Sequence, residues 1–152
     1  MTRTTLILLA TFGSAALLAG AFTFQAFGYA PCHLCLLQRW PHAAAVVIGV
    51  VALAAGLRVF AWLGALAALT TAGLGLYHTG VERQWWQGPT TCTSGSIDGV
   101  DPTDLLNQIL AAPIVRCDQV AWQMLGLSMA SWNMLASLAL AGIWIMAARR
   151  AA

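Results

Sequence analysis

Four long apolar stretches dominate the chain and constrain its fold more than any other feature. Three of them approach or reach the roughly 20 residues that a helix needs to cross the hydrocarbon core of a bilayer. The second is shorter, and it spans only if its helix begins back near Cys35, which would bring Gln38 and Arg39 into the membrane interface. The stretches run over residues 5–27, 43–57, 59–77 and 132–148.

Composition places these stretches in a membrane rather than in a soluble core. Hydrophobic residues make up 60% of the 152 residues and charged residues only 8%, which is too little polar surface to cover a soluble globule. The sequence therefore predicts one membrane domain over residues 1–152, an all-α bundle of four transmembrane helices. We expect the spans at about 5–27, 35–57, 59–79 and 131–148.

The arginines indicate the orientation of the bundle. The chain has no lysine, and arginines stand before the first stretch, in the short turn after the second and directly after the fourth: Arg3, Arg58, Arg149 and Arg150. By the positive-inside rule both termini and this turn are cytoplasmic. The other two connections, at about 28–35 and 80–130, are then outside. An interfacial aromatic belt is expected near the span ends on that side, from Trp40, Trp85, Trp86 and Trp132.

The first stretch has an alternative interpretation. Ala19-Gly20-Ala21 resembles a signal-peptidase site that follows an arginine and an apolar core. Because the apolar run is longer than a typical signal core, we expect a retained helix. Cleavage would leave three spans with the same sidedness, so the placement of the cysteines does not depend on this choice.

The long outer connection is polar and rich in turn residues. Residues 87–96 form turns and show no helical period. Asp101 and Pro102 then suit the N-cap and first position of a helix. Apolar residues on one face follow, at Leu105, Leu106, Ile109 and Leu110. We predict a short amphipathic helix, ended by Pro113, that lies in the membrane interface; docking on the bundle is the alternative.

Four cysteines form two pairs on the outer side, where disulfides form and persist. Cys32 and Cys35 make a Cys-x-x-Cys motif, and Cys92 and Cys117 lie in the polar connection. Cys35 at the start of a helix would feel the positive end of the helix dipole, and Arg39 one turn further on adds a full positive charge. Both effects stabilise a thiolate. A thiolate beside a cation at a lipid interface suits the reduction of a membrane-dissolved oxidant such as a quinone.

The sequence offers three hydrogen-bond donors for the ring oxygens of a quinone: Gln38, Arg39 and His78. The second cysteine pair, in turn-rich polar sequence, is expected to be the more exposed pair and hence the one that a soluble protein reaches. Together the pairs predict a relay. The first is oxidised by something dissolved in lipid, and the second trades disulfides with something in water.

Two other interpretations of the cysteines compete with the relay. Cys32 and Cys35 could be zinc ligands in a site completed by His33, His42, Cys92 or Cys117. The second pair does not repeat the Cys-x-x-Cys spacing, so we expect no metal site. All four cysteines could instead form static disulfides that staple the outer loops of a non-enzymatic scaffold. Relay disulfides should yield to mild thiol reagents without unfolding, whereas structural ones resist.

Three runs of residues resemble the disulfide-bond formation protein B (DsbB) family. They are Pro-Cys-x-Leu-Cys-x-x-Gln-Arg at 31–39, the outer loop with two spaced cysteines, and Cys-Asp-Gln-Val-Ala-Trp-Gln-Met-Leu-Gly-Leu-Ser-Met at 117–129. The resemblance covers nearly the whole chain, including the spans and the charge placement. Members are bacterial inner-membrane quinone reductases that reoxidise the periplasmic thiol oxidase DsbA. The resemblance implies the same fold, location and activity here, with the cysteines periplasmic.

The family mechanism implies a role for each cysteine of this chain. A reduced DsbA-like partner of thioredoxin fold attacks Cys92, and the released Cys117 attacks Cys32. Cys35 then leaves as a thiolate and passes electrons to ubiquinone or menaquinone beside Arg39. Membrane lipid is the other expected contact, and nothing indicates nucleic acid.

Two further positions are interpreted through the same resemblance. His78 matches the family's quinone-side histidine by its location. Some members have a carboxylate where Gln38 stands, so the resemblance does not give this position a proton role. A vitamin-K-epoxide-reductase-like quinone reductase shares the logic of four helices and two thiol pairs, but its cysteine order and its usual polar residue on the quinone differ.

Overall fold

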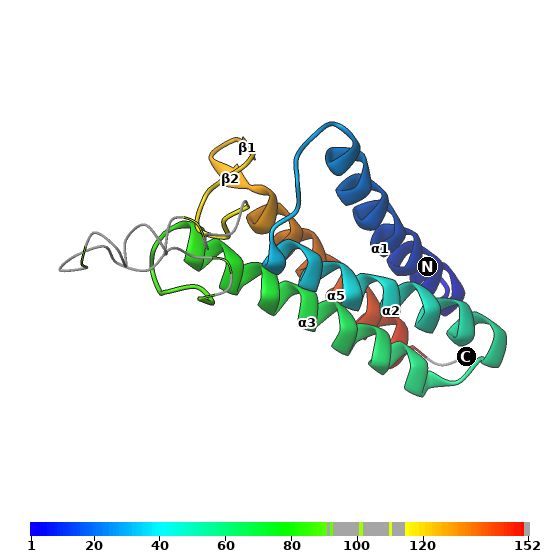
Figure 1. Ribbon diagram of the computed structural model, residues 1–152. Helices are drawn as coiled ribbons and strands as arrows, with labels where there is room; N and C mark the ends of the chain where they lie inside the picture. The colour runs from blue at the N-terminus through cyan, green and yellow to red at the C-terminus, as the bar shows by residue number, and fades with distance from the viewer. Residues whose placement is uncertain (91, 93–100, 102–109, 111–114, 151–152) are drawn as a thin grey trace.

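The computed structural model describes residues 1–90, 92, 101, 110 and 115–150. Within these residues, four helices are long and apolar enough to cross a membrane, which confirms the predicted bundle. They are α1 (Arg3–Ala26), α2 (His33–Ala55), α3 (Arg58–Glu82) and α5 (Met129–Arg149). Figure 1 shows the helices lying along one another, so the chain is a multi-pass, all-α membrane protein.

The helices pack as a closed ring around small residues. α2 lies between α1 and α3, and α5 packs against both α3 and α1. In lipid, small residues allow helix backbones to approach closely. A Cβ atom added at Gly64 of α3 would lie 2.6 Å from the ring of Trp144 on α5, and that tryptophan is fully buried. Alanines supply most of the surrounding core: Ala10, Ala52, Ala61, Ala65, Ala68, Ala141 and Ala147.

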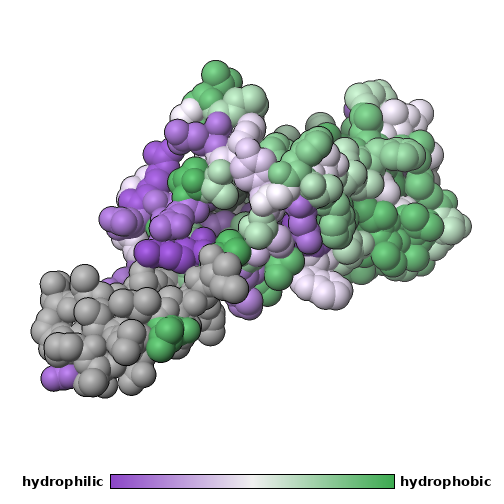
Figure 2. Space-filling model, turned by 45° about the horizontal axis from the view of Figure 1, so that its top comes forward, coloured by the Kyte–Doolittle hydropathy of each residue, from purple (hydrophilic) through white to green (hydrophobic). Residues whose placement is uncertain are grey.

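Both termini and the turn between α2 and α3 lie at one end of the bundle (Figure 1). Gly56 ends α2 in the left-handed conformation (φ 67°), and its carbonyl oxygen accepts a 2.9 Å hydrogen bond from NH1 of Arg3. Arg150 donates to the carbonyl oxygen of Met1 at 2.6 Å. Four of the arginines, at positions 3, 58, 149 and 150, therefore stand at this end. Figure 2 shows hydrophilic side chains collected toward the other end.

A β-hairpin at that other end was not predicted. β1 (Gln123–Met124) pairs antiparallel with β2 (Leu127–Ser128). Between the strands, Leu125 and Gly126 have φ values of 53° and 76°. Ser128 then caps α5, because its Oγ accepts a 3.2 Å hydrogen bond from the backbone N–H of Ser131. The predicted amphipathic helix after Asp101 falls almost wholly outside the described residues.

Candidate active site

The first cysteine pair lies at the start of α2. Cys32 is the N-cap residue, and its Sγ accepts a 3.2 Å hydrogen bond from the backbone N–H of Cys35. The two Sγ atoms are 2.7 Å apart and both thiols are free. Cys32 is buried and Cys35 is half-buried. The hydrogen bond with Cys35, together with burial, raises the pKa of the Cys32 thiol above its usual range.

The second pair, Cys92 and Cys117, forms a disulfide. The backbone N–H of Cys117 donates to the carbonyl oxygen of Cys92 at 2.7 Å, and that of Cys92 donates to Pro89 at 3.0 Å. We expected this pair to be the exposed one, which is wrong: Cys92 is 1% and Cys117 0% exposed. The reason is that the pair packs into one apolar cluster with Cys32, Leu34 and Val81. Both cysteine pairs therefore belong to a single buried cluster.

His78 of α3 lies between the two pairs. Its Nε2 atom is 3.5 Å from Cys32 Sγ and 3.8 Å from Oε1 of Glu82, one turn further along α3. The ring also interacts with the backbone of Cys117. The other Glu82 oxygen accepts a hydrogen bond from Ser128 Oγ. The histidine thus connects the first pair, the second pair and the cap of α5.

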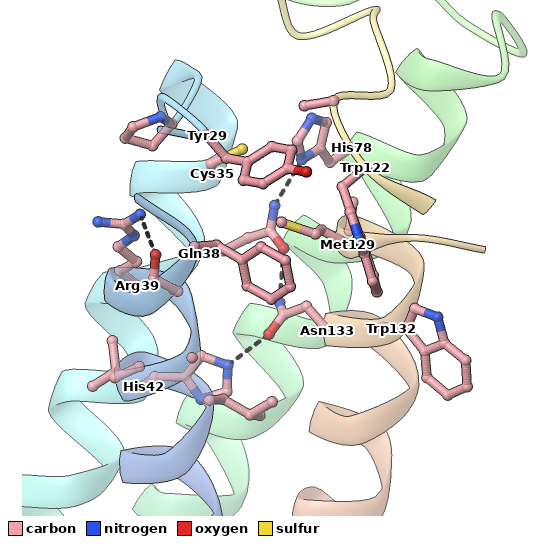
Figure 3. Close-up of a pocket in the computed structure, with 18 of the residues that line it drawn as sticks. Tyr29, Cys35, Gln38, Arg39, His42, His78, Trp122, Met129, Trp132 and Asn133 are labelled. Carbon is pink, nitrogen blue, oxygen red and sulfur yellow. Dashed lines mark hydrogen bonds between the residues drawn. The ribbon is translucent and has the colours of Figure 1, made fainter. Parts of the chain in front are cut away.

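A cavity of about 320 Å³ opens beside Cys35. It lies among α1, α2, α5 and the segment before β1, and most of its wall is apolar. Among the cysteines, only Cys35 lines it. Among the residues that the structure describes, Tyr29 brings a phenol to the wall, and the other polar or charged side chains there are Gln38, Arg39, His42, His78 and Asn133 (Figure 3). An apolar cavity with a few fixed polar groups and one thiol suits a small apolar molecule.

Arg39 lies on the cavity wall, with its guanidinium directed toward α1. NH1 donates to Oε1 of Gln25 at 2.7 Å, and NH2 donates to the carbonyl oxygen of Ala21 at 3.3 Å. The guanidinium also lies over the Phe22 ring, 4.8 Å from its centroid. In Figure 3 the side chain points away from Cys35 and His78. Arg39 therefore joins α2 to α1 at the edge of the cavity.

Gln38 connects His78 to a polar group on α5. Its Nε2 atom lies 2.9 Å from Nδ1 of His78 and donates to the carbonyl oxygen of Leu34 at 3.2 Å. Its Oε1 accepts a 2.7 Å hydrogen bond from Asn133 Nδ2. Asn133 Oδ1 in turn accepts from Nε2 of His42 at 2.9 Å. Figure 3 shows this chain running from His78 down to His42.

His42 enters the sequence-based predictions only as a possible zinc ligand, and Asn133 does not enter them. Each is a lone polar residue within an apolar stretch, and nothing in the sequence pairs positions 42 and 133. Their polarity could have marked both as functional candidates, because polar residues inside a membrane are costly and commonly mark functional positions. The structure adds the partner that the sequence could not supply.

Three potential metal ligands meet here. The ligand atoms of Cys32, Cys35 and His78 all lie within 4.8 Å of one another. The zinc alternative in the sequence did not include His78 as a ligand. It proposed His33, His42, Cys92 or Cys117, and the structure shows that His33 is exposed. His78 is poorly prepared as a ligand, because the Gln38 N–H group occupies its Nδ1 atom and places the ring proton on Nε2, the nitrogen that faces the thiols. Metal-binding histidines usually donate their second nitrogen to an acceptor instead.

Comparison with known proteins agrees with this constellation of cysteines. A family model described as "Disulfide bond formation protein DsbB" matches residues 3–147. Disulfide bond formation protein B of Azoarcus sp. (strain BH72) is 31% identical over 90% of this chain and 87% of its own length. The protein of that name from Xanthomonas oryzae pv. oryzae (strain MAFF 311018) is 31% identical over 93% and 87%.

A third relative, disulfide bond formation protein B 2 of Pseudomonas aeruginosa PAO1, is 32% identical over 70% of this chain and 67% of its own length. No solved structure matches the chain. The family match covers the four spans and all four cysteines, and it supports the activity of a membrane oxidoreductase in disulfide formation. This chain therefore belongs to the DsbB family.

Proposed function

We propose that the protein oxidises the dithiol of a soluble DsbA-like protein and passes the electrons to a membrane quinone. Family membership supports the disulfide chemistry, and the arrangement of the cysteines supports the direction of electron flow. We place the protein in the bacterial inner membrane with both termini cytoplasmic and the cysteines periplasmic. Four of the seven arginines stand at the end of the bundle that holds both termini and the α2–α3 turn, away from the thiols.

The observation that carries the proposal is the shared cluster of the two cysteine pairs. Cys32 and Cys117 belong to one group of buried residues, so a thiolate released at Cys117 has Cys32 close by. Cys35, the partner of Cys32, lines the cavity. The pairs are thus ordered as a path from the second pair through Cys32 to Cys35 and the cavity.

Exchange along this path conserves thiols and disulfides at each step. A partner thiolate attacks Cys92, forms a mixed disulfide and releases Cys117 as a thiolate. Cys117 attacks Cys32 of an oxidised first pair, and Cys35 leaves as a thiolate. The second partner thiolate then releases Cys92, which attacks Cys117 and frees Cys32. The partner is oxidised, the second pair is re-formed, and the first pair holds two electrons.

The cavity beside Cys35 is the proposed quinone site. A bound quinone would supply the acceptor for two electrons and two protons. The apolar wall would exclude water from the ring, and Arg39 would fix the wall on the α1 side. Both hydrogens of the Gln38 amide are already donated to Leu34 and His78. Gln38 would therefore position His78 rather than donate a hydrogen bond to the quinone ring.

The second pair must open before a partner can react with it. Cys92 is 1% exposed, so an incoming thiolate reaches its Sγ only after the surrounding contacts separate. Docking of the partner is the step that we expect to separate them. Membrane lipid, the other expected contact, would cover the apolar outer faces of the helices.

Quinone reduction by purified protein tests the proposal. The variants are Cys35→Ser and the double variant Cys92→Ser/Cys117→Ser, each assayed with a reduced DsbA-like protein and with dithiothreitol. We expect the double variant to lose turnover with the protein substrate and to keep turnover with dithiothreitol, because the small dithiol reduces Cys32–Cys35 directly. Cys35→Ser should lose both. Wild-type protein that reduces no quinone, with disulfides that resist mild reductants, would support the scaffold alternative.

A further inference from the structure

The orientation of the Asn133 amide is fixed by a backbone carbonyl. Thr71 Oγ1 donates its only hydrogen to the carbonyl oxygen of Gln38 at 3.1 Å, so toward Asn133 it can only accept. Asn133 Nδ2 faces it at 3.2 Å and also donates to Gln38 Oε1 at 2.7 Å. The nitrogen of Asn133 must therefore be the atom that points at Gln38.

A second backbone carbonyl fixes Gln38. The carbonyl oxygen of Leu34 is an acceptor, and Gln38 Nε2 lies 3.2 Å from it. The same nitrogen lies 2.9 Å from Nδ1 of His78. A nitrogen that carries hydrogens requires a lone pair opposite it, so Nδ1 is the unprotonated nitrogen of the His78 ring. The ring proton is then on Nε2.

The Nε2 atom faces the reacting sulfurs. The acceptors around it are Cys32 Sγ at 3.5 Å, Glu82 Oε1 at 3.8 Å and the backbone of Cys117. His78 is 3% exposed, so bulk water does not compete for this N–H group. A buried donor that faces a sulfur stabilises the anionic form of that sulfur more strongly than an exposed donor.

We propose that Gln38 and Asn133 are positioning residues that hold His78 as the Nε2–H tautomer and direct this N–H group at the sulfur of Cys32. An amide at position 38 is essential for holding His78 in this tautomer. A carboxylate there would accept a hydrogen from Nδ1 and leave Nε2 without one. The choice between glutamine and a carboxylate therefore decides whether His78 presents a donor or an acceptor to the first cysteine pair.

The catalytic meaning of this inference rests on the proposed function. When Cys92 attacks Cys117, the bond between Cys117 and Cys32 breaks and its electron pair leaves on Cys32. The Nε2–H group donates a hydrogen bond to that thiolate while the proton stays on the nitrogen. His78 would thus stabilise the reduced first pair, and so make Cys32–Cys35 a stronger acceptor of electrons from the second pair.

Nitrogen NMR of histidine-labelled protein in detergent tests the tautomer directly. The chain has three histidines, and His78→Asn identifies the His78 signals by their loss. We expect wild-type His78 to carry its proton on Nε2. Gln38→Glu should move the proton to Nδ1, and Asn133→Leu, which removes one of the two hydrogen bonds that orient the Gln38 amide, should populate both tautomers. Ser137→Ala is the matched control, since Ser137 lies one turn along α5 and contacts His42 but not Gln38.

The redox equilibrium of the first pair tests the consequence. In a Cys92→Ser/Cys117→Ser background, the Cys32–Cys35 pair is equilibrated with glutathione. Loss of a hydrogen bond to a thiolate should shift the constant by about tenfold toward the disulfide in Gln38→Glu, and by a smaller factor in the same direction in Asn133→Leu, which keeps part of the Nε2–H tautomer. Asn133→Leu adds no charge, so it separates the hydrogen bond from the charge of a new carboxylate. Ser137→Ala should leave the constant unchanged.

A wild-type proton on Nδ1, or His78 spectra and redox constants that are the same in wild type and both variants, would overturn the inference. Neither measurement uses a quinone or a protein partner. The tautomer can therefore be established even if quinone reduction fails, and quinone reduction can be established even if the tautomer is wrong.

Discussion

Arg39 on α2 donates a 2.7 Å hydrogen bond from NH1 to Oε1 of Gln25 on α1, across the edge of the cavity. The same guanidinium reaches the backbone of Ala21 and the ring of Phe22. One charged side chain thus holds together the two helices that form one wall of the proposed quinone site.

The Arg39→Ala change is expected to weaken quinone use and spare thiol exchange. Without the guanidinium, the wall between α1 and α2 loses its hydrogen bonds, and we expect the KM for quinone to rise about tenfold. The rate at which Cys92–Cys117 exchanges with a DsbA-like protein should not change. Steady-state kinetics with a short-chain quinone measure the first quantity, and stopped-flow exchange measures the second.

Arg39→Lys is the informative companion variant. Lysine keeps the charge but lacks the planar fork that serves Gln25 and Ala21 together. We expect its KM to lie between those of wild type and Arg39→Ala. Equal loss of quinone use and thiol exchange in Arg39→Ala would contradict a role confined to the cavity wall.

Gly64→Ala should destabilise the bundle. The added Cβ would lie 2.6 Å from the Trp144 ring, which is fully buried and has no free space to move into. Overpacking of this kind costs about 1–3 kcal/mol. Thermal unfolding in detergent measures it, and Gly73→Ala on the same helix is the control, because nothing lies within 4 Å of a Cβ there. Equal stability of the two variants would show that α3 and α5 are not closely packed.

Leu125→Gly is expected to stabilise the hairpin. Leu125 has a φ of 53° and is 85% exposed, so its side chain makes little contact that could offset the cost of a left-handed conformation. Removing the side chain should recover about 1 kcal/mol of that cost. Met124→Gly in β1 is the control and should destabilise. Hydrogen exchange of the hairpin amides reports both changes, and slower exchange in Met124→Gly than in Leu125→Gly would contradict the prediction.

The ion pair beside Cys117 should influence the second disulfide only above acidic pH. Arg116 donates from Nε and NH2 to the two carboxylate oxygens of Asp118, at 2.9 and 2.6 Å, and these hydrogen bonds lower the pKa of Asp118. A lowered folded-state pKa gives stability that is complete above the unfolded value of about 3.9 and is lost as the pH falls through the folded value.

Reduction of Cys92–Cys117 by a phosphine measures this effect. At pH 7 we expect Asp118→Asn to be reduced faster than wild type, since the ion pair helps to hold the segment next to Cys117. The ratio of the two rate constants should begin to fall below about pH 4 and should reach one only below the lowered pKa of Asp118. A ratio that changes near pH 6 would point to a different titrating group.

The four spans could be predicted because apolar length and arginine placement are properties of the sequence alone. The hairpin could not, since its strands are two residues long and Leu125-Gly126 is not a usual turn pair. Burial of Cys92 and Cys117 was also beyond prediction. It depends on packing against Val81 and Leu34, which are distant in the chain, whereas the local sequence is polar and turn-forming.

In the site, too, features set by neighbouring residues could be predicted, and contacts between residues far apart in the chain could not. Cys32 and Cys35 could be placed from their spacing and their position before a span. The link between Gln38 and Asn133 could not, because two polar residues 95 positions apart give no sign that they meet. The direction of that hydrogen bond, which sets the His78 proton, depends on backbone carbonyls that only a folded structure positions.

Of the four sulfurs, only that of Cys35 borders the cavity, while Cys32 lies behind it in the buried cluster. A reduced ring in the cavity would therefore meet a single sulfur, and the Cys92–Cys117 disulfide would be out of its reach. Thiol exchange at Cys92–Cys117 and quinone reduction at Cys35 would therefore take place at separate positions. On the proposed function, electrons could return from the membrane pool to the Cys92–Cys117 disulfide only by retracing the path through Cys35 and Cys32.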